Sequence, residues 1–190
     1  MRKLAILTFV TADGVMQAPR LADEDPSGGF AGGWAVPCWD DVMAQVGQHA
    51  MAEPYDLLLG RNTYDMFAAH NAADGDENPM NRSTKYVVTS RREGLDWQNT
   101  VALEGDVAES VRSLKAGEGP LLQVHGSWQL IQALLAHDLV DFFRIWSFPV
   151  FVGAGKRLFS EGAPRTPLEL TASETTAGGA VMTLYRKRSA

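Results

Sequence analysis

Apolar residues recur along this chain in short, nearly continuous runs, and turn residues or polar segments separate one run from the next. Apolar runs of about four to eight residues are typical of strands that are covered on both faces of a sheet. The pattern therefore predicts buried strands at residues 4–10, 55–59, 85–89, 101–103 and 121–124.

Several segments between these runs place apolar residues about three or four positions apart, which is the spacing of one face of a helix. They predict helices at residues 40–52, 62–69, 107–114 and 127–136. Two other stretches are rich in glycine, aspartate, asparagine or proline and are predicted to be loops, at residues 11–37 and 70–83.

The C-terminal part of the chain carries strand patterns only. Residues 139–152 are apolar and aromatic, and Pro149 marks a bend or a strand edge. Residues 168–175 and 180–188 alternate around the turn at 177–179, which predicts a hairpin. This order of elements predicts one α/β domain over the whole chain, with a mixed, mostly parallel sheet, helices on both faces and an antiparallel C-terminal hairpin.

Composition narrows the class of partner. The chain is 45% apolar and 21% charged, as in ordinary globular proteins, and its net charge of −6 argues against a nucleic-acid partner. Residues 4–10 are too short to cross a membrane and lack a signal-peptide cleavage site. Cys38 is the only cysteine, so an internal disulfide and a thiolate metal site are excluded. We expect a cytoplasmic protein without a membrane partner or a metal.

Three of the predicted strands end in small, hydroxyl-bearing or basic residues. A helix N-terminus carries a partial positive charge, glycine lets a phosphate approach the backbone, and arginine binds phosphate with a forked donor. Strand ends that lie side by side would therefore form one anion-binding ledge, which predicts a phosphate-rich ligand. The candidate residues are Gly60, Arg61 and Thr63, then Thr89, Ser90 and Arg91, then His125, Gly126 and Ser127.

Each of these segments also has a purely structural interpretation. Arg61 fits a solvent-facing residue after a glycine turn, and Thr89 and Arg91 fit a polar turn. Ser127 fits an N-cap in a tight strand–helix turn. A hydrolase nucleophile at Ser127 is the least supported interpretation, because the Gly-x-Ser-x-Gly pattern is absent.

Two further features are candidates for the same site. Gly153 and Gly155 open a glycine-rich loop that resembles the start of a dinucleotide fingerprint, but Leu158 stands where the third glycine belongs. Asp13, in the turn that leaves the first strand, is placed to reach a ligand at the sheet's edge, and Asp41 stands at a helix start. An Asx-turn explains Asp13 equally well, and helix capping explains Asp41.

Taken together, these segments resemble the dihydrofolate-reductase-like superfamily. Within it they are similar to the reductase (C-terminal) domain of bifunctional riboflavin biosynthesis proteins and its stand-alone bacterial relatives. The resemblance covers nearly the whole chain. It is carried by residues 11–15, 58–64, 88–91, 124–130 and 139–159.

The resemblance implies a three-layer α/β/α fold with NADPH bound across the strand ends. In such a protein Gly60, Arg61 and Thr63 would hold phosphates, and Ser90 and Arg91 would lie near the adenosine 2′-phosphate. Gly126 and Ser127 would hold the pyrophosphate, and Gly153 and Gly155 would border the nicotinamide. This chain has His125 where the family often has a glycine, which changes the local peptide geometry.

The implied reaction is hydride transfer to a small heterocyclic substrate, of the pyrimidine or pterin kind. Examples are 5-amino-6-(5-phosphoribosylamino)uracil-type and dihydrofolate-type compounds. The resemblance makes Asp13 the first candidate for proton transfer or substrate contact, and Asp41 or its neighbour Asp40 the candidate for the helix carboxylate of dihydrofolate reductases. A protein that keeps the fold and binds NADPH without turnover is the alternative, because no single catalytic acid stands out. The resemblance also implies a homodimer, for which the aromatic run at residues 142–146 would offer an apolar strand.

Overall fold

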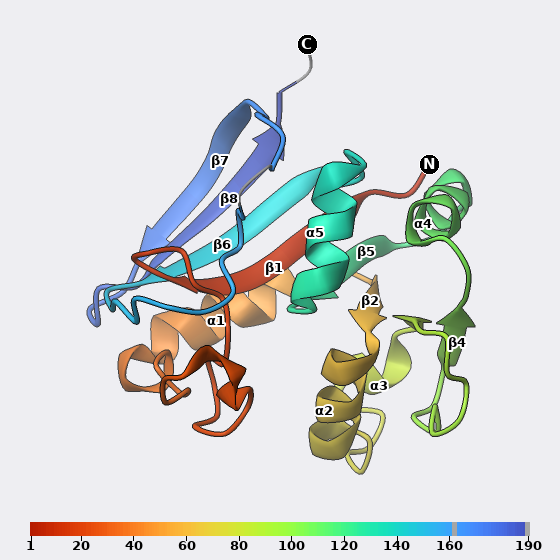
Figure 1. The fold of residues 1–190 in the computed structure, drawn as a ribbon, viewed down its shortest axis with the longest axis horizontal. Helices are drawn as coiled ribbons and strands as arrows, with labels where there is room; N and C mark the ends of the chain where they lie inside the picture. The colour runs from red at the N-terminus through yellow and green to blue at the C-terminus, as the bar shows by residue number, and fades with distance from the viewer. Residues whose placement is uncertain (161–162, 189–190) are drawn as a thin grey trace.

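The computed structural model describes residues 1–160 and 163–188. Within this part of the chain, eight strands form one sheet in the order β4-β3-β2-β5-β1-β6-β8-β7 (Figure 1). The strands are β1 (Leu4–Thr11), β2 (Tyr55–Gly60), β3 (Lys85–Val88), β4 (Thr100–Leu103), β5 (Leu121–His125), β6 (Phe142–Phe148), β7 (Leu168–Thr175) and β8 (Val181–Lys187).

The sheet is parallel from β4 to β6 and antiparallel beyond it. β1 pairs in parallel with β5 and with β6, and β2 pairs in parallel with β5 and with β3. β8 is antiparallel to both β6 and β7. The predicted mixed, mostly parallel sheet with an antiparallel C-terminal hairpin is confirmed.

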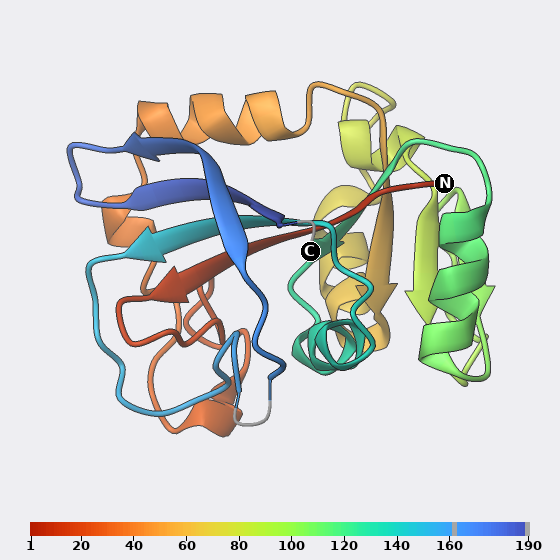
Figure 2. The same cartoon turned by 90° about the horizontal axis from the view of Figure 1, so that it is seen from above.

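Helices cover both faces of the parallel region. Figure 2 shows α1 on one side of the sheet and α5 on the other. The helices are α1 (Asp41–Ala50), α2 (Arg61–Asn71), α3 (Pro79–Arg82), α4 (Val107–Ala116) and α5 (Trp128–Ala136), with short 3₁₀ turns at Pro26–Gly28 and Val36–Cys38.

The middle of β2 explains why the predicted strands are continuous apolar runs. Leu58 packs in the cluster under α4 and α5, whereas Leu57 and Leu59 pack in the cluster on the α2 side. All three side chains are fully buried. Successive side chains of a strand point to opposite faces, so a strand buried on both faces cannot alternate with polar residues.

One predicted loop contains a short helix. Residues 70–83 were expected to be irregular, but α3 lies within them, with Pro79 in its first turn and the side chain of Asn78 capping it. Asn81 of this helix is fully buried. Its amide nitrogen donates to the carbonyl oxygens of Asn71 and Gly75, each at 3.1 Å, which fastens the segment against the end of α2.

The aromatic run at residues 142–146 forms most of β6, which lies between β1 and β8. Both of its edges are already hydrogen-bonded within the chain. The expectation that this strand is offered for pairing with a second copy is therefore wrong. Within the described residues, the edge strands of the sheet are β4 and β7. No helix among these residues is long and apolar enough to cross a membrane.

Candidate functional site

The predicted ledge residues lie along one edge of the sheet. β3, β2 and β5 are neighbouring parallel strands, so their carboxyl ends, at Val88, Gly60 and His125, point the same way. β1, which ends at Thr11, continues the row on the other side of β5. Ligands of open α/β sheets bind at the carboxyl ends of the strands, and this edge is therefore the candidate site.

The starts of α2 and α5 meet at this edge. The backbone N–H of Gly60 donates a hydrogen bond of 2.8 Å to the hydroxyl oxygen of Ser127. A Cβ built on Gly126 would lie 3.8 Å from a side-chain carbon of Thr63. Four of the predicted phosphate-binding residues, contributed by two strand–helix junctions, are thus in immediate contact.

The connection between β5 and α5 has an uncommon backbone. Gly126 has a φ of +65°, and Ser127 also has a φ of +65° with a ψ of +63°. Two successive residues with positive φ turn the chain sharply between β5 and α5. A non-glycine residue in this conformation costs about 1–2 kcal/mol, which indicates that the position is constrained by more than local folding.

These two helices differ from the others in how they begin. Among the described residues, α1, α3 and α4 start with side-chain caps from Asp40, Asn78 and Asp106. α2 and α5 start at Gly60 and Ser127 with no capping side chain and no acidic residue in the first turn. Their first N–H groups and positive dipole ends are therefore available to an anion.

Arg61 is placed differently from the phosphate contact that was predicted. Its Nε donates to Asp65 at 2.8 Å, and its Nη1 donates to the carbonyl oxygens of Arg91 and Glu93 at 3.1 and 2.8 Å. Its Nη2 donates to the carbonyl oxygen of Gly94 at 3.4 Å. The guanidinium therefore holds the loop after β3 and leaves little donor capacity for a ligand.

The same loop presents Ser90 and Arg91 to solvent. The backbone N–H of Arg91 donates to the hydroxyl oxygen of Thr89 at 3.0 Å, and this hydroxyl donates to the carbonyl oxygen of Arg91 at 3.1 Å. The Arg91 side chain is 62% exposed, and its guanidinium lies 3.9 Å from a carboxylate oxygen of Asp65. Thr89 thus shapes the turn, and Arg91 has the freedom to bind an anion.

His125 contributes its backbone to the ledge, but its side chain lies inside the protein. The imidazole is buried between the rings of Tyr55 and Phe67, and its Nε2 is 2.9 Å from Oε1 of Gln123. Burial, together with the positive charge of Arg144, lowers the pKa of His125 to about 4. The ring is neutral at pH 7 and does not face a ligand at the edge of the sheet.

Asp13 fastens a loop from the far end of the chain. Its carboxylate accepts hydrogen bonds from the hydroxyl of Thr11 at 2.5 Å and from the N–H of Gly153 at 3.0 Å. The guanidinium of Arg157 lies 3.7 Å away. The Thr11 hydroxyl is the main cause that holds the pKa of Asp13 below its ordinary value, against the opposing effect of burial. The carboxylate therefore stays ionised at neutral pH.

The glycine-rich loop packs closely on the segment after β1. A Cβ on Gly155 would lie 2.8 Å from the ring of Phe30, 2.9 Å from Oε1 of Gln17 and 3.0 Å from Val15. Gly155 has a φ of +114°, and Gly153 has a φ of +78° with open space where a Cβ would stand. Gly155 is thus required by close packing, whereas Gly153 is required by backbone conformation.

Asp41 stands in the first turn of α1 with its side chain exposed. The neighbouring Asp40 is the cap, and it accepts a hydrogen bond of 3.0 Å from the N–H of Met43. Favourable interaction with the helix dipole accounts for Asp41 at this position. Among the described residues, no group of three or more histidine, cysteine, aspartate or glutamate side chains is placed to hold a metal ion.

Comparison with known proteins agrees with this architecture. The RibD C-terminal domain family matches residues 2–183, which is most of the chain. The chain belongs to this family. YyaP of Bacillus subtilis strain 168 is 26% identical over 136 residues, which cover 68% of this chain and 72% of that protein.

Two solved structures show that the fold is that of dihydrofolate reductase. A putative riboflavin biosynthesis protein from Shewanella sp. PV-4 superposes with a TM-score of 0.68 at 21% identity, over 100% of both chains. Dihydrofolate reductase from Enterococcus faecalis, in complex with NADP(H) and RAB-propyl, superposes with a TM-score of 0.63 at 15% identity. This second match covers 98% of this chain and 97% of that one.

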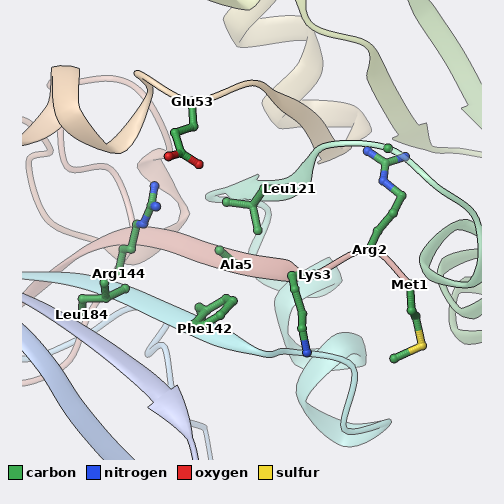
Figure 3. Close-up of a pocket in the computed structure, with 10 residues that line it drawn as sticks. Met1, Arg2, Lys3, Ala5, Glu53, Leu121, Phe142, Arg144 and Leu184 are labelled. Atoms are coloured by element: carbon green, nitrogen blue, oxygen red, sulfur yellow. The ribbon is translucent and has the colours of Figure 1, made fainter.

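A pocket of about 470 Å³ lies at the opposite edge of the RibD-type sheet, near the starts of β1, β5 and β6 (Figure 3). Its walls include Ala5, Leu121 and Phe142, and the side chains of Glu53 and Arg144 face each other across one end. This pocket differs from the candidate site because it lies at the other end of the strands and its walls carry charges of both signs. We place the candidate site at the carboxyl ends of the strands, because the uncapped starts of α2 and α5 lie there and not at the edge where the strands begin.

Sequence patterns alone did not identify every residue that shapes this edge. Asp65 was not singled out, although its spacing of four residues from Arg61 on a helix is that of an ion pair. Trp128 lies within the segment 124–130 that carries the resemblance, but its contact was not predicted: its indole N–H donates to the carbonyl oxygen of Arg157 at 2.8 Å. No local pattern signals that second contact, which ties α5 to the glycine-rich loop.

Proposed function

We propose that this protein is an NADPH-dependent reductase that transfers a hydride to a small heterocyclic substrate at the carboxyl edge of the sheet. The observation that carries the proposal is the meeting of two uncapped helix starts at Gly60 and Ser127. A dinucleotide carries several negative charges in a row, and adjacent helix N-termini provide the matching donors without desolvating a side-chain charge.

Different residues at the site would bind different parts of the cofactor. The first turns of α2 and α5, with Thr63, Gly126 and Ser127, would hold the phosphates of the dinucleotide. Ser90 and Arg91, which are exposed on the loop after β3, would contact the adenosine 2′-phosphate. An arginine at this point is a known means of choosing NADP over NAD. Gly153 and Gly155 would border the nicotinamide.

NADPH, when bound, supplies the hydride, and the protein supplies binding, orientation and exclusion of water. Asp13 would contribute by holding the glycine-rich loop beside the nicotinamide, because its carboxylate already accepts hydrogen bonds from the hydroxyl of Thr11 and the N–H of Gly153. The substrate class follows the family, and includes pyrimidines of the 5-amino-6-(5-phosphoribosylamino)uracil type and pterins of the dihydrofolate type. The cofactor in the Enterococcus structure and the description of the Shewanella protein support this assignment.

A direct test is titration of the purified protein with NADPH, followed by the fluorescence of the nicotinamide. Oxidation of NADPH is then followed by the loss of the absorbance of the reduced nicotinamide, over a panel of pterins and pyrimidines. We expect saturable binding and turnover with at least one heterocycle. Absence of NADPH binding at millimolar cofactor contradicts the proposal.

The alternative is a protein of the same fold that binds NADPH without turnover. The observation that favours it is the state of Asp13, whose carboxylate is ionised and already hydrogen-bonded, so that it is a poor proton donor. Tight NADPH binding without oxidation across the whole panel would support this alternative. We further propose that the protein acts in the cytoplasm as a homodimer, which the mass of the particle in solution tests.

A further inference from the structure

Arg61 occupies the position after β2 where a phosphate ligand was expected, yet its donors point at the protein itself. Three carbonyl oxygens of one loop, those of Arg91, Glu93 and Gly94, accept hydrogen bonds from its two Nη atoms. Its Nε is bound to Asp65 one helical turn along α2. The side chain is only 16% exposed, so the loop covers it.

The loop has no regular structure of its own at this point, because β3 ends at Val88 and β4 begins at Thr100. Carbonyl oxygens in such a segment are normally satisfied by water, and the segment then samples many conformations. A single guanidinium that binds three of them selects one conformation. The hydroxyl of Thr89 reinforces it, because this hydroxyl bonds both the N–H and the carbonyl oxygen of Arg91.

We infer that Arg61 is a positioning residue that sets the preference of the protein for a 2′-phosphorylated adenosine, and that it acts through Arg91 instead of touching the phosphate. The inference rests on the proposed function, because the 2′-phosphate is that of the proposed cofactor. A preformed loop binds an anion more tightly than a mobile one, since less conformational freedom is lost on binding. In this arrangement the partly buried Arg61 sets the specificity for NADPH, and the exposed Arg91 makes the contact.

Direct contact and positioning predict different results for one conservative change. Arg61→Lys keeps the positive charge, but a single ammonium cannot bind Asp65 and three loop carbonyls in the same geometry. If Arg61 attracted the phosphate by its charge, the lysine variant would keep most of the preference. If Arg61 braces the loop, Arg61→Lys and Arg61→Gln lose it to a similar extent.

The probes are adenosine 2′,5′-bisphosphate and AMP, which differ by the 2′-phosphate and require no turnover. Calorimetry gives the ratio of their dissociation constants for the full chain and its variants. We expect Arg61→Lys and Arg61→Gln each to reduce the preference for the bisphosphate by about tenfold, which is a typical coupling within one hydrogen-bond network. In an Arg91→Ala background, the same changes at Arg61 should leave the ratio unchanged.

Two further variants keep the test independent of the folding of the Arg61 variants. Gly94→Ala would place a Cβ 3.0 Å from Nη2 of Arg61 in a residue with a φ of +72°, so it should disturb the same contact and lower the same ratio. Arg92→Gln is the matched control, because Arg92 is exposed and pairs with Glu104, which follows β4, instead of with Arg61 or Asp65. We expect the control to change the ratio less than twofold, well below the roughly tenfold effect at Arg61.

The outcomes separate the inference from the proposed function. A wild-type protein that binds neither probe contradicts both. A wild-type preference that Arg91→Ala abolishes but Arg61→Lys leaves intact contradicts the positioning role alone. An effect of Arg61→Gln that persists in the Arg91→Ala background also overturns it, because that result indicates direct contact with the ligand.

Discussion

The hydroxyl oxygen of Ser127 accepts a hydrogen bond from the backbone N–H of Gly60, which links the ends of the neighbouring strands β2 and β5. The two residues are 67 positions apart in the chain. The bond fixes the start of α5 against the start of α2 at a distance of 2.8 Å. Each helix start lacks a capping side chain, so this contact determines the spacing of the two helix N-termini that we propose bind phosphate. It is the structural core of the candidate site.

Two substitutions of Ser127 distinguish the contribution of its hydrogen bond to stability from that of its backbone conformation. Ser127→Ala leaves the N–H of Gly60 without its acceptor and should lower the free energy of unfolding by about 1–2 kcal/mol. Ser127→Gly loses the same bond but adopts the left-handed conformation without strain, so it should be about 1 kcal/mol more stable than the alanine variant. Urea unfolding measures both. A glycine variant less stable than the alanine variant would contradict this account.

Arg91→Ala should weaken the binding of NADPH much more than that of NADH. A charge-assisted bond to phosphate contributes about 1.5–3 kcal/mol, so we expect a loss of about tenfold or more for NADPH and little change for NADH. Fluorescence titration with each cofactor gives the two ratios. Equal losses for both cofactors would remove the role in 2′-phosphate recognition.

Asp13→Asn tests whether this carboxylate is structural. An acid whose pKa is lowered on folding stabilises the protein above its ordinary pKa of 3.8, and this contribution is lost as the pH falls through the lowered value. We therefore expect the variant to lose about 1–3 kcal/mol at pH 7, and the difference from wild type to shrink below pH 3.8. Asp41→Asn, the exposed counterpart, should change stability by less than about 0.5 kcal/mol.

The pH dependence of turnover provides the complementary measurement on Asp13. A proton donor would give kcat an acidic or basic limb that disappears in the asparagine variant. An ionised, hydrogen-bonded carboxylate would leave the shape of the profile unchanged and lower only its height. If Asp13→Asn removed a limb of the kcat profile near neutral pH, Asp13 would be a catalytic acid and not only a structural carboxylate.

His125 should make the protein sensitive to mild acid. Its pKa is lowered from 6.5 to about 4, so the folded state binds fewer protons than the unfolded state between these values. Stability is therefore complete above pH 6.5 and falls as the pH decreases through this window, by up to about 3 kcal/mol at about 1.4 kcal/mol per pKa unit. His125→Gln should flatten this part of the profile, whereas the exposed His70→Gln should not.

Asn81→Ala tests the helix that was missing from the predicted elements. The fully buried side chain of Asn81 donates hydrogen bonds to three carbonyl oxygens and accepts one of 2.6 Å from the indole N–H of Trp97. Its removal leaves several buried groups unsatisfied, and we expect a loss of about 2–4 kcal/mol in urea unfolding. A loss below about 1 kcal/mol would show that water replaces these bonds.

The strands could be predicted closely because their signal is local. Burial on both faces requires an unbroken apolar run, and the run at residues 121–124 corresponds to β5 at Leu121–His125. The strand ends could be placed at one edge for the same reason, since parallel strands joined by helices all end on one side. α3 was missed because a helix of four residues is too short to show a periodic pattern.

The directions of the side chains could not be predicted in the same way. Arg61 has the residue type and position of a phosphate ligand, but its acceptors are carbonyl groups of a loop about thirty residues further along. His125 stands in the predicted motif, but strand alternation turns its ring toward Tyr55 and Phe67 and away from the ledge. Such partners depend on long-range packing, which a motif does not encode.

The position of β5 has a consequence for synthesis of the chain. Both neighbours of β1 in the sheet, β5 and β6, come much later in the sequence, and β5 must enter between β1 and β2. When only the first 120 residues have left the ribosome, the apolar strands β1 and β2 still have unpaired edges. Unpaired edges of apolar strands promote aggregation. Truncation before β5 should therefore yield an insoluble fragment, whereas chaperones that shield strand edges should raise the yield of the intact chain.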